Sequence, residues 1–387
     1  MTTTSEPFRF DFDAPVDRKN TASVKWDRYR GRDIVPMWVA DMDFQAPPAV
    51  LAALSNHVQH GVFGYTYPPN ELTATVVDML KDRHNWAVKP EWLVWLPGLV
   101  TGINVACRAV GKAGEAVMTC VPVYPPFLSA PGLGGRELIA VPHAEQRMRY
   151  GFDFDALEKS ITPQTKLFLL CNPQNPTGRV FLKDELAKLA DICLRCGVVI
   201  CSDEIHCGLV LDTDKQHISL AALDEALAAR TITLLAPSKT YNIPGLGCSL
   251  AVIPDKGLRS AFRKTMDGIV PHVNALGLVA ALAAWRDSED WRLALLDYLR
   301  GNRDLLEHFI LHTSGLKMTH VEATYLAWID CRTLPVDQPA RFFEQAGVGL
   351  SDGADFGAPG FVRLNFGCSR ALLAEAIARI DRAVSRL

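Results

Sequence analysis

The stretch KLFLLCNPQNPTGRVFLKDELAKLADICLRCGVVICSDEIH, residues 166–206, contains the pattern that decides the fold. An apolar run at 166–171 opens it, and a second apolar run lies at 198–202. Between these runs an apolar side chain recurs every three or four positions, as on one face of a helix: Leu182, Leu186, Leu189, Cys193 and Cys196. Gly197 follows as a suitable helix C-cap. The pattern predicts a strand, a helix and a second strand.

The same alternation continues on both sides of this stretch. Five further short apolar runs lie at 92–97, 115–120, 137–141, 231–236 and 248–253. Runs that are apolar throughout are typical of strands covered on both faces. We therefore expect an α/β fold of three layers, with a mostly parallel central sheet between helices. Functional groups should gather at the carboxyl ends of its strands.

The two ends of the chain have a different texture. Residues 1–45 are polar and aromatic with no long period, which suggests an N-terminal arm. We expect a large domain at 46–285 and a smaller α+β domain at 286–387, which the arm joins. The last helix of the small domain should bury one apolar face, formed by Leu373, Ile377, Ile380 and Val384.

Composition excludes several classes of protein. Of 387 residues, 49% are hydrophobic and 21% are charged, which is typical of a soluble globular protein rather than a disordered one. A net charge of −3 indicates no nucleic-acid surface. No apolar run reaches the roughly 18 residues of a membrane span, and the first residues lack a signal-peptide pattern. We expect a cytoplasmic protein without membrane partners.

Ten cysteines raise the question of a metal or redox site. The pair most like one is Cys193 and Cys196, but both lie on the apolar stripe of the predicted helix. No second pair and no matching histidines complete a zinc site. We therefore predict that both sulfurs are small core groups and that the protein has no metal.

Four places carry chemical groups, and three of them follow predicted strands. Asn175 lies in the loop CNPQNPTG, Asp203 in SDEIH, and Lys239 in APSKTYN. Arg363 lies in RLNFG near the C-terminus. Each alone could be structural: a turn, a solvated loop, a surface charge or an ion-pair partner. Together, groups at three strand ends of one sheet predict a shared crevice. No GxGxxG or GxxxxGK[ST] loop supports dinucleotide or ATP binding.

These motifs closely resemble the fold-type-I pyridoxal-phosphate enzymes of the class I/II aminotransferase family. The resemblance covers nearly the whole chain and rests on the order Asn-Pro-x-Asn-Pro-Thr-Gly, Ser-Asp-Glu, Ser-Lys and a late arginine. Within the family the chain is most similar to the carbon–sulfur lyase branch, the MalY/PatB-type cystathionine β-lyases. The stretches that indicate this branch lie at 37–44 (MWVADMDF), 61–66 (GVFGYT), 202–206 and 238–243.

The resemblance implies pyridoxal 5′-phosphate as cofactor and a role for each residue. Lys239 would form the Schiff base and move the substrate α-proton. Asp203 would hold the ring nitrogen protonated, and Asn175 would bind the phenolic oxygen. Tyr124 would stack on the ring. His206 stands where the broader family has a tyrosine, and it would also bind near the phenolic oxygen.

The resemblance implies only part of the set of groups that would bind the phosphate. Backbone amides of Val100 and Thr101, at a helix start after a strand, would bind the phosphate. Ser238 would assist them. Ala236 replaces a usual phosphate-binding serine and Gly247 replaces a frequent arginine, so one family cation is missing.

The remaining implied roles concern the substrate and a second subunit. Arg363 would bind the α-carboxylate of an amino-acid substrate. Tyr65 would reach the site of the neighbouring subunit in a homodimer. The expected reaction is β-elimination from cystathionine or a related cysteine S-conjugate, giving a thiol, pyruvate and ammonia. An aminotransferase with the same residues is the alternative, and a non-catalytic regulatory protein on the same fold is a third.

Overall fold

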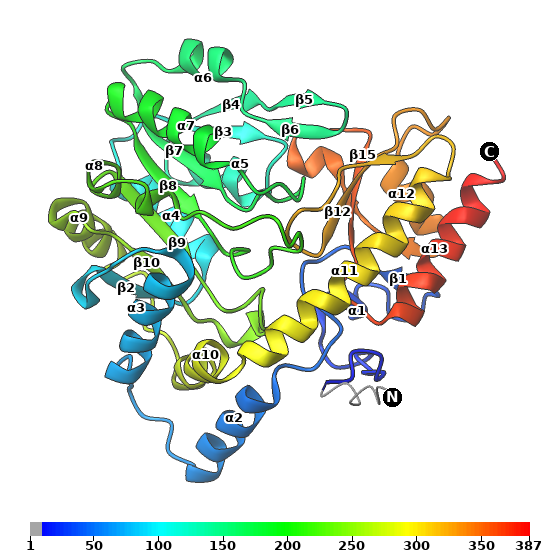
Figure 1. Cartoon of the computed structure of the whole chain (residues 1–387), viewed down its shortest axis with the longest axis horizontal. Coiled ribbons are helices and arrows are strands. Elements are labelled where there is room, and N and C mark those ends of the chain that lie inside the picture. The colour runs from blue at the N-terminus through cyan, green and yellow to red at the C-terminus, as the bar shows by residue number, and fades with distance from the viewer. Residues whose placement is uncertain (1–9) are drawn as a thin grey trace, which may run out of the picture.

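A seven-stranded sheet forms the centre of the chain in the computed structural model, which describes residues 10–387 (Figure 1). Its strand order is β2-β10-β9-β8-β7-β3-β4, and only β10 runs against its neighbours. The strands are β2 (Leu93–Leu96), β3 (Ala116–Val121), β4 (Glu137–Pro142), β7 (Thr165–Cys171), β8 (Val199–Asp203), β9 (Thr231–Leu235) and β10 (Ser249–Val252). All seven predicted strands are present, and the predicted mostly parallel sheet is confirmed.

Helices cover both faces of this sheet, as the all-apolar strands require. One face packs against α4 (Leu99–Ala109), α5 (Pro126–Leu133) and α9 (Lys256–Met266). The other packs against α6 (Phe154–Ser160), α7 (Lys183–Arg195) and α8 (Glu225–Ala228). The three-layer α/β prediction is therefore confirmed.

The prediction for the two cysteines of α7 is half right. Cys193 is buried in the core, but Cys196 is exposed. Cys196 is the C-cap residue, where the helix ends and the chain turns into Gly197 with φ +69°, so the apolar stripe no longer faces the sheet. Within residues 10–387 no three His, Cys, Asp or Glu side chains are grouped so that they could hold a metal ion.

A second sheet lies beside the first and contains the C-terminal part of the chain. Its order is β11 (Lys317–Met318), β12 (Leu326–Asp330), β15 (Phe361–Asn365) and β14 (Ser351–Asp352), all antiparallel. Its helices include α11 (Glu289–Leu311), α12 (Pro339–Gln345) and α13 (Arg370–Val384). The predicted apolar face of α13 is present, with Leu373 and Ile380 buried and Ile377 and Val384 packed beside them.

The N-terminal arm runs along this second sheet. Its strand β1 (Val35–Pro36) pairs in parallel with β13 (Val348–Gly349), and its helix α1 (Val24–Asp27) lies just before. Residues 1–9 of the predicted arm lie outside the described residues. The domain boundaries at 45 and 285 stay a prediction.

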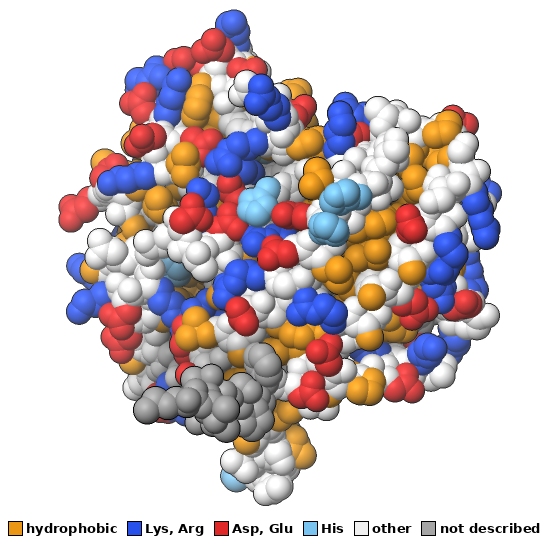
Figure 2. Space-filling model, turned by 45° about the vertical axis from the view of Figure 1, so that its right-hand side comes forward, with side chains coloured by type: hydrophobic (Ala, Val, Ile, Leu, Met, Phe, Trp, Pro, Cys, Tyr) orange, Lys and Arg blue, Asp and Glu red, His pale blue; other side chains and the backbone are white. Residues whose placement is uncertain are grey.

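Three further helices, α2 (Pro48–His60), α3 (Asn70–His84) and α10 (Ala275–Asp287), pack on one another at the open edge of the large sheet. A hairpin of β5 (Ala144–Gln146) and β6 (Arg149–Gly151) follows β4. Figure 2 shows acidic and basic side chains interspersed over one face of the molecule, as expected from the near-neutral net charge. Over residues 10–387, every helix is too short or too polar to cross a bilayer. The cytoplasmic location stays a prediction.

A buried ion pair ties the arm to the segment 37–44. The ammonium of Lys25, 1% exposed, lies 2.7 Å from the Asp43 carboxylate, which also accepts hydrogen bonds from Arg18 at 2.7 Å and from the Trp26 indole at 2.8 Å. Burial alone would raise the pKa of Asp43, but Lys25, Trp26 and Arg18 together hold it below its usual value. The carboxylate is therefore charged at neutral pH, and its charge is compensated only by these partners.

Replacing Lys25 by methionine should destabilise the protein strongly. The change keeps much of the side-chain volume but removes the cation that compensates a buried carboxylate, which costs about 3 kcal/mol. The shift of the urea unfolding midpoint measures this loss. Lys19→Met, which removes an exposed lysine of the same arm, is the matched control. Equal midpoints for the two variants would contradict the importance of the pair.

Candidate functional site

The predicted site residues follow four strands that are neighbours in the sheet. Tyr124 comes after β3, Asn175 after β7 and Lys239 after β9, while Asp203 is the last residue of β8. In register, Cys171 lies opposite Asp203. Because these strands are parallel, their carboxyl ends meet at one edge. The sheet therefore brings the amide, the carboxylate and the lysine together at one edge, as predicted.

The loop 172–178 is rigid because its own side chains fix it. The Gln174 amide oxygen accepts hydrogen bonds from the Thr177 backbone at 3.0 Å and hydroxyl at 2.8 Å, and its nitrogen donates to the Pro122 carbonyl at 2.7 Å. Gly178 has φ +73°, and a Cβ there would lie 2.9 Å from Val321. The loop therefore holds Asn175 in one place at the end of β7.

Lys239 is half-buried without a carboxylate in contact with it. Its Nζ donates a 2.6 Å hydrogen bond to the carbonyl oxygen of Ala40. Burial and the charge of Arg363 lower the pKa of Lys239 to about 8, although Asp41 and Asp203 act against the fall. A substantial fraction of the amine is therefore neutral near pH 8, as a nucleophile or a general base requires.

Arg363 is a second cation without an acidic partner, and it is buried. From β15, with 4% of its surface exposed, it donates hydrogen bonds to the Asn175 amide oxygen at 3.0 Å and to the Trp38 carbonyl at 2.8 Å. A 3.3 Å contact to the Ser351 hydroxyl completes its partners, and its Nε has none. Burial lowers the pKa of Arg363 to about 10. A guanidinium held only by neutral acceptors can take up a carboxylate.

The acidic pair in SDEIH divides between two faces. Burial raises the pKa of Asp203 to about 7, although the Ile205 backbone N–H donates to it at 3.1 Å. Glu204 points elsewhere: it accepts from the Ser202 hydroxyl at 2.9 Å and lies 2.9 Å from His217 Nε2. Asp203 is therefore the carboxyl of the site, and Glu204 is structural.

His206 is buried beside these groups in the neutral form. Burial, with the charges of Lys239 and Arg363, lowers its pKa to about 3. Its Nδ1 has no hydrogen-bond partner in the described part of the chain. The edge of its ring faces Tyr325, with centroids 6.4 Å apart. A neutral imidazole here can donate or accept one hydrogen bond toward a ligand.

The start of α4 provides the predicted backbone donors. The N-cap residue Gly98 makes no side-chain cap, so the N–H groups of Val100 and Thr101 stay available for an anion. Ser238, the residue before Lys239, is half-buried. Gly247 has φ +58°, and a Cβ there would lie 3.1 Å from the Pro97 carbonyl, so a side chain at this position would be strained.

Tyr65 does not join the other residues within one chain. Its side chain is fully exposed, on the segment between α2 and α3. Phe63 and Tyr67, on the same segment, are also largely exposed.

Sequence reasoning missed the chemical contribution of the segment 37–44. The carbonyl of Trp38 holds Arg363, while that of Ala40 accepts from both Lys239 and the Tyr325 hydroxyl, the latter at 3.0 Å. Backbone carbonyls leave no trace in the sequence. The side chains of Asn242 and Asn365 hydrogen-bond to the backbone of this segment and hold it in place. A polar side chain in an apolar context is the one sequence signal that could have indicated these contacts.

These residues fit pyridoxal 5′-phosphate, the cofactor that the sequence predicts. A buried carboxyl suits a protonated ring nitrogen, and Tyr124, partly buried near it, suits stacking on the ring. The Asn175 amide nitrogen donates no hydrogen bond among the described residues and can reach a phenolic oxygen. Lys239 and Arg363 then lack only anionic partners, which a phosphate and a carboxylate supply.

Comparisons with known proteins agree with this geometry. The model of the family described as aminotransferase class I and II matches residues 32–380. Cystathionine β-lyase PatB of Bacillus subtilis is 37% identical, with 97% of this chain and all of that protein covered. The crystal structure of OvoB has a TM-score of 0.95 at 46% identity, covering 97% of this chain and 99% of that one.

A third similar structure is cystalysin from Treponema denticola, which contains a pyridoxal 5′-phosphate cofactor. Its TM-score is 0.94 at 34% identity, with 97% of this chain and 99% of that chain covered. The fold, the four-strand site and these full-length similarities agree with the resemblance found in the motifs. The chain belongs to the class I and II aminotransferase family and is similar to the PatB-type lyases within it.

Proposed function

We propose that this protein is a pyridoxal-phosphate-dependent carbon–sulfur β-lyase that cleaves cystathionine or a related cysteine S-conjugate. The observation that carries the proposal is a pair of cations without an acidic partner of their own: Lys239, half-buried at a strand end, and Arg363, buried on β15. The carboxyl of Asp203 lies at the same edge of the large sheet as Lys239. A zwitterionic amino acid and an anionic cofactor would supply the missing charges. Similarity to proteins named cystathionine β-lyase supports the reaction type.

The residues of this chain divide the work by position. When bound, pyridoxal 5′-phosphate supplies the electron sink that stabilises negative charge at the substrate α-carbon. Arg363 orients the substrate by its carboxylate with two parallel hydrogen bonds. The neutral amine of Lys239 accepts the α-proton at Nζ, and its depressed pKa matches that task. Asp203, once paired with a protonated ring nitrogen, is held as the carboxylate.

Elimination follows if a good leaving group sits on the β-carbon. The C–S bond breaks, the thiolate leaves with its electron pair, and the enamine that remains is hydrolysed by water to pyruvate and ammonia. An aminotransferase would use the same residues and deliver the proton to the cofactor instead. His206, where the broader family has tyrosine, and the lyase-like segments 37–44 and 61–66 favour elimination.

A shared active site in a homodimer is part of this proposal. The segment 61–67 exposes several large apolar side chains together, which is typical of an interaction surface: Val62, Phe63, Tyr65 and Tyr67. Residues 63–67 and 271–276 line one hollow of about 770 Å³. Tyr65 can reach a cofactor only from a partner subunit, since it points away from its own site.

Replacing Lys239 by alanine should abolish turnover and leave a folded protein. No other amine lies between the end of β9 and the Ala40 carbonyl to accept the proton. In the wild type, borohydride reduction followed by peptide mapping should place the pyridoxyl group on Lys239. A label on any other lysine would show that the assignment is wrong. A purified protein without the cofactor's absorbance band would favour the non-catalytic alternative.

Cystathionine should give pyruvate with no keto acid present. Elimination needs no acceptor, whereas transamination stops after one half-reaction unless a keto acid restores the cofactor. Lactate dehydrogenase coupling follows pyruvate, and the absorbance of the cofactor follows its conversion to the amine form. Turnover that depends strictly on an acceptor, with the amine form accumulating without it, would identify an aminotransferase.

Mixing two inactive variants should restore activity if sites are shared. In a hybrid of Tyr65→Ala and Lys239→Ala subunits, one of the two sites would combine an intact lysine with the partner's intact tyrosine. We expect recovery after the two proteins are unfolded and refolded together, measured as pyruvate formation. Refolding each variant alone is the control. No recovery in a proven hybrid would mean that Tyr65 acts in its own chain.

A further inference from the structure

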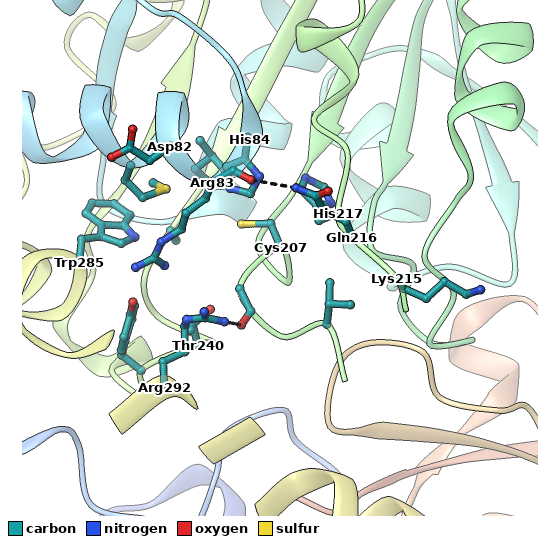
Figure 3. A pocket seen from close by; sticks show the side chains of 16 residues that line it. Asp82, Arg83, His84, Cys207, Lys215, Gln216, His217, Thr240, Trp285 and Arg292 are labelled. Carbon is teal, nitrogen blue, oxygen red and sulfur yellow. Dashed lines mark hydrogen bonds between the residues drawn. The ribbon is translucent and has the colours of Figure 1, made fainter. Parts of the chain in front are cut away.

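A cavity of about 370 Å³ lies against the Lys239 turn but does not include the proposed catalytic residues. Its walls come from the end of α3, the loop 207–217, the turn 240–241 and helices α10 and α11 (Figure 3). Lys239, Asp203, Asn175 and Arg363 are absent from its lining. The mechanism above therefore assigns no role to this space.

Two arginines dominate the charge of the cavity. Figure 3 shows the Arg83 side chain reaching from α3 toward Arg292, with the Trp285 ring beside it. One carboxylate serves both guanidinium groups: Glu289 lies 2.6 Å from Arg83 Nη2 and 2.6 Å from Arg292 Nη2. Arg83 spends only one of its five N–H donors on this contact. Two cations against one anion leave a positive charge and unused donors.

A buried hydroxyl with an unused proton also lines the cavity. Tyr241 is 1% exposed, and its oxygen lies close to the Arg83 guanidinium, but its O–H donates to no described residue. Burial raises its pKa, and the charge and hydrogen bond of Arg83, together with the charge of Arg292, oppose that rise. A buried hydroxyl that leaves its proton without an acceptor costs free energy that a bound acceptor would recover. The hydroxyl and Arg83 thus both offer donors to the same space.

His84 leaves the charge of the cavity positive without adding to it. Burial, with the charges of His217, Arg83 and Arg292, lowers the pKa of His84 to about 3. His84 is therefore neutral at physiological pH. In Figure 3 the other charged labelled groups, Asp82 and Lys215, point away from the space between the two arginines.

We propose that this cavity binds a small oxyanion, the carboxylate or phosphate group of a metabolite, between Arg83, Arg292 and the Tyr241 hydroxyl. The site is separate from the one at the strand ends and rests on none of the catalytic assignments. Tyr241 is two residues from Lys239, so a bound anion contacts the Lys239 turn directly. It reaches the turn at Gly208 through Arg292, which donates a 3.0 Å hydrogen bond to the Gly208 carbonyl. An anion bound at this position would act as an effector of the active site.

Calorimetric titration of the holoenzyme tests the site, with inorganic phosphate in one arm and acetate in the other at constant ionic strength. We expect saturable binding at this site in at least one arm, distinguished from any binding at Arg363 by the cavity variants, and the tighter arm identifies the preferred group. Arg83→Gln and Tyr241→Phe should each weaken it by about tenfold, since each removes a hydrogen bond to a charged group. Tyr241→Phe keeps the ring and its packing against Trp291.

The control is Arg286→Gln, which removes a positive charge from α10 next to Trp285 but outside the cavity. It should bind the anion as the wild type does. No saturable binding in either arm would overturn the proposal. Equal affinity in the wild type and both cavity variants, or an equal loss in the control, would mean an adventitious ion only. Because binding is read directly, these outcomes do not depend on whether the protein is a lyase.

Discussion

Two backbone carbonyl groups, those of Trp38 and Ala40, hold the two cations on which the site depends, the buried Arg363 and the half-buried Lys239. Removing an ammonium or guanidinium from water costs several kcal/mol unless its donors are satisfied. Lys239 comes from the large sheet and Arg363 from the small one, so the segment 37–44 joins them. That segment is itself fixed by Asn242 and Asn365 and by the ion pair of the arm. Large sheet, small sheet and arm therefore meet at the reacting groups.

The side chains at the end of β8 point alternately to its two sides, which gives the neighbouring residues Asp203 and Glu204 different roles. Successive side chains of an extended chain point to opposite sides. Asp203 therefore faces the site, whereas Glu204 turns toward His217, which lines the separate cavity. The Lys239 turn likewise lies between two spaces, since Lys239 contacts Ala40 while Thr240 and Tyr241 line the cavity. One sheet edge thus positions two positively charged spaces with different walls.

The pattern of apolar runs was sufficient for the architecture. All seven strands of the large sheet lie where the runs predict them, because strands buried on both faces must be apolar throughout. The exception in burial is the edge strand β4, which is largely exposed. Asn175, Asp203 and Lys239 could be predicted to meet because parallel strands end at a common edge. Cys196 shows the limit: the periodicity continues past the last helical turn, and only the position of the helix end exposes that side chain.

By itself the sequence determined the α/β class, the family and the side chains at the strand ends, since apolar periodicity or short motifs indicate each of these. Only the tertiary structure decided how the cations are held, because their acceptors are backbone carbonyls that any residue could carry. The same holds for Arg363 and Asn175, which are 188 residues apart and contact at 3.0 Å. The pairing of Lys25 with Asp43 and the meeting of Arg83, Arg292 and Tyr241 were equally hidden. Contacts between distant segments depend on packing, which local patterns do not record.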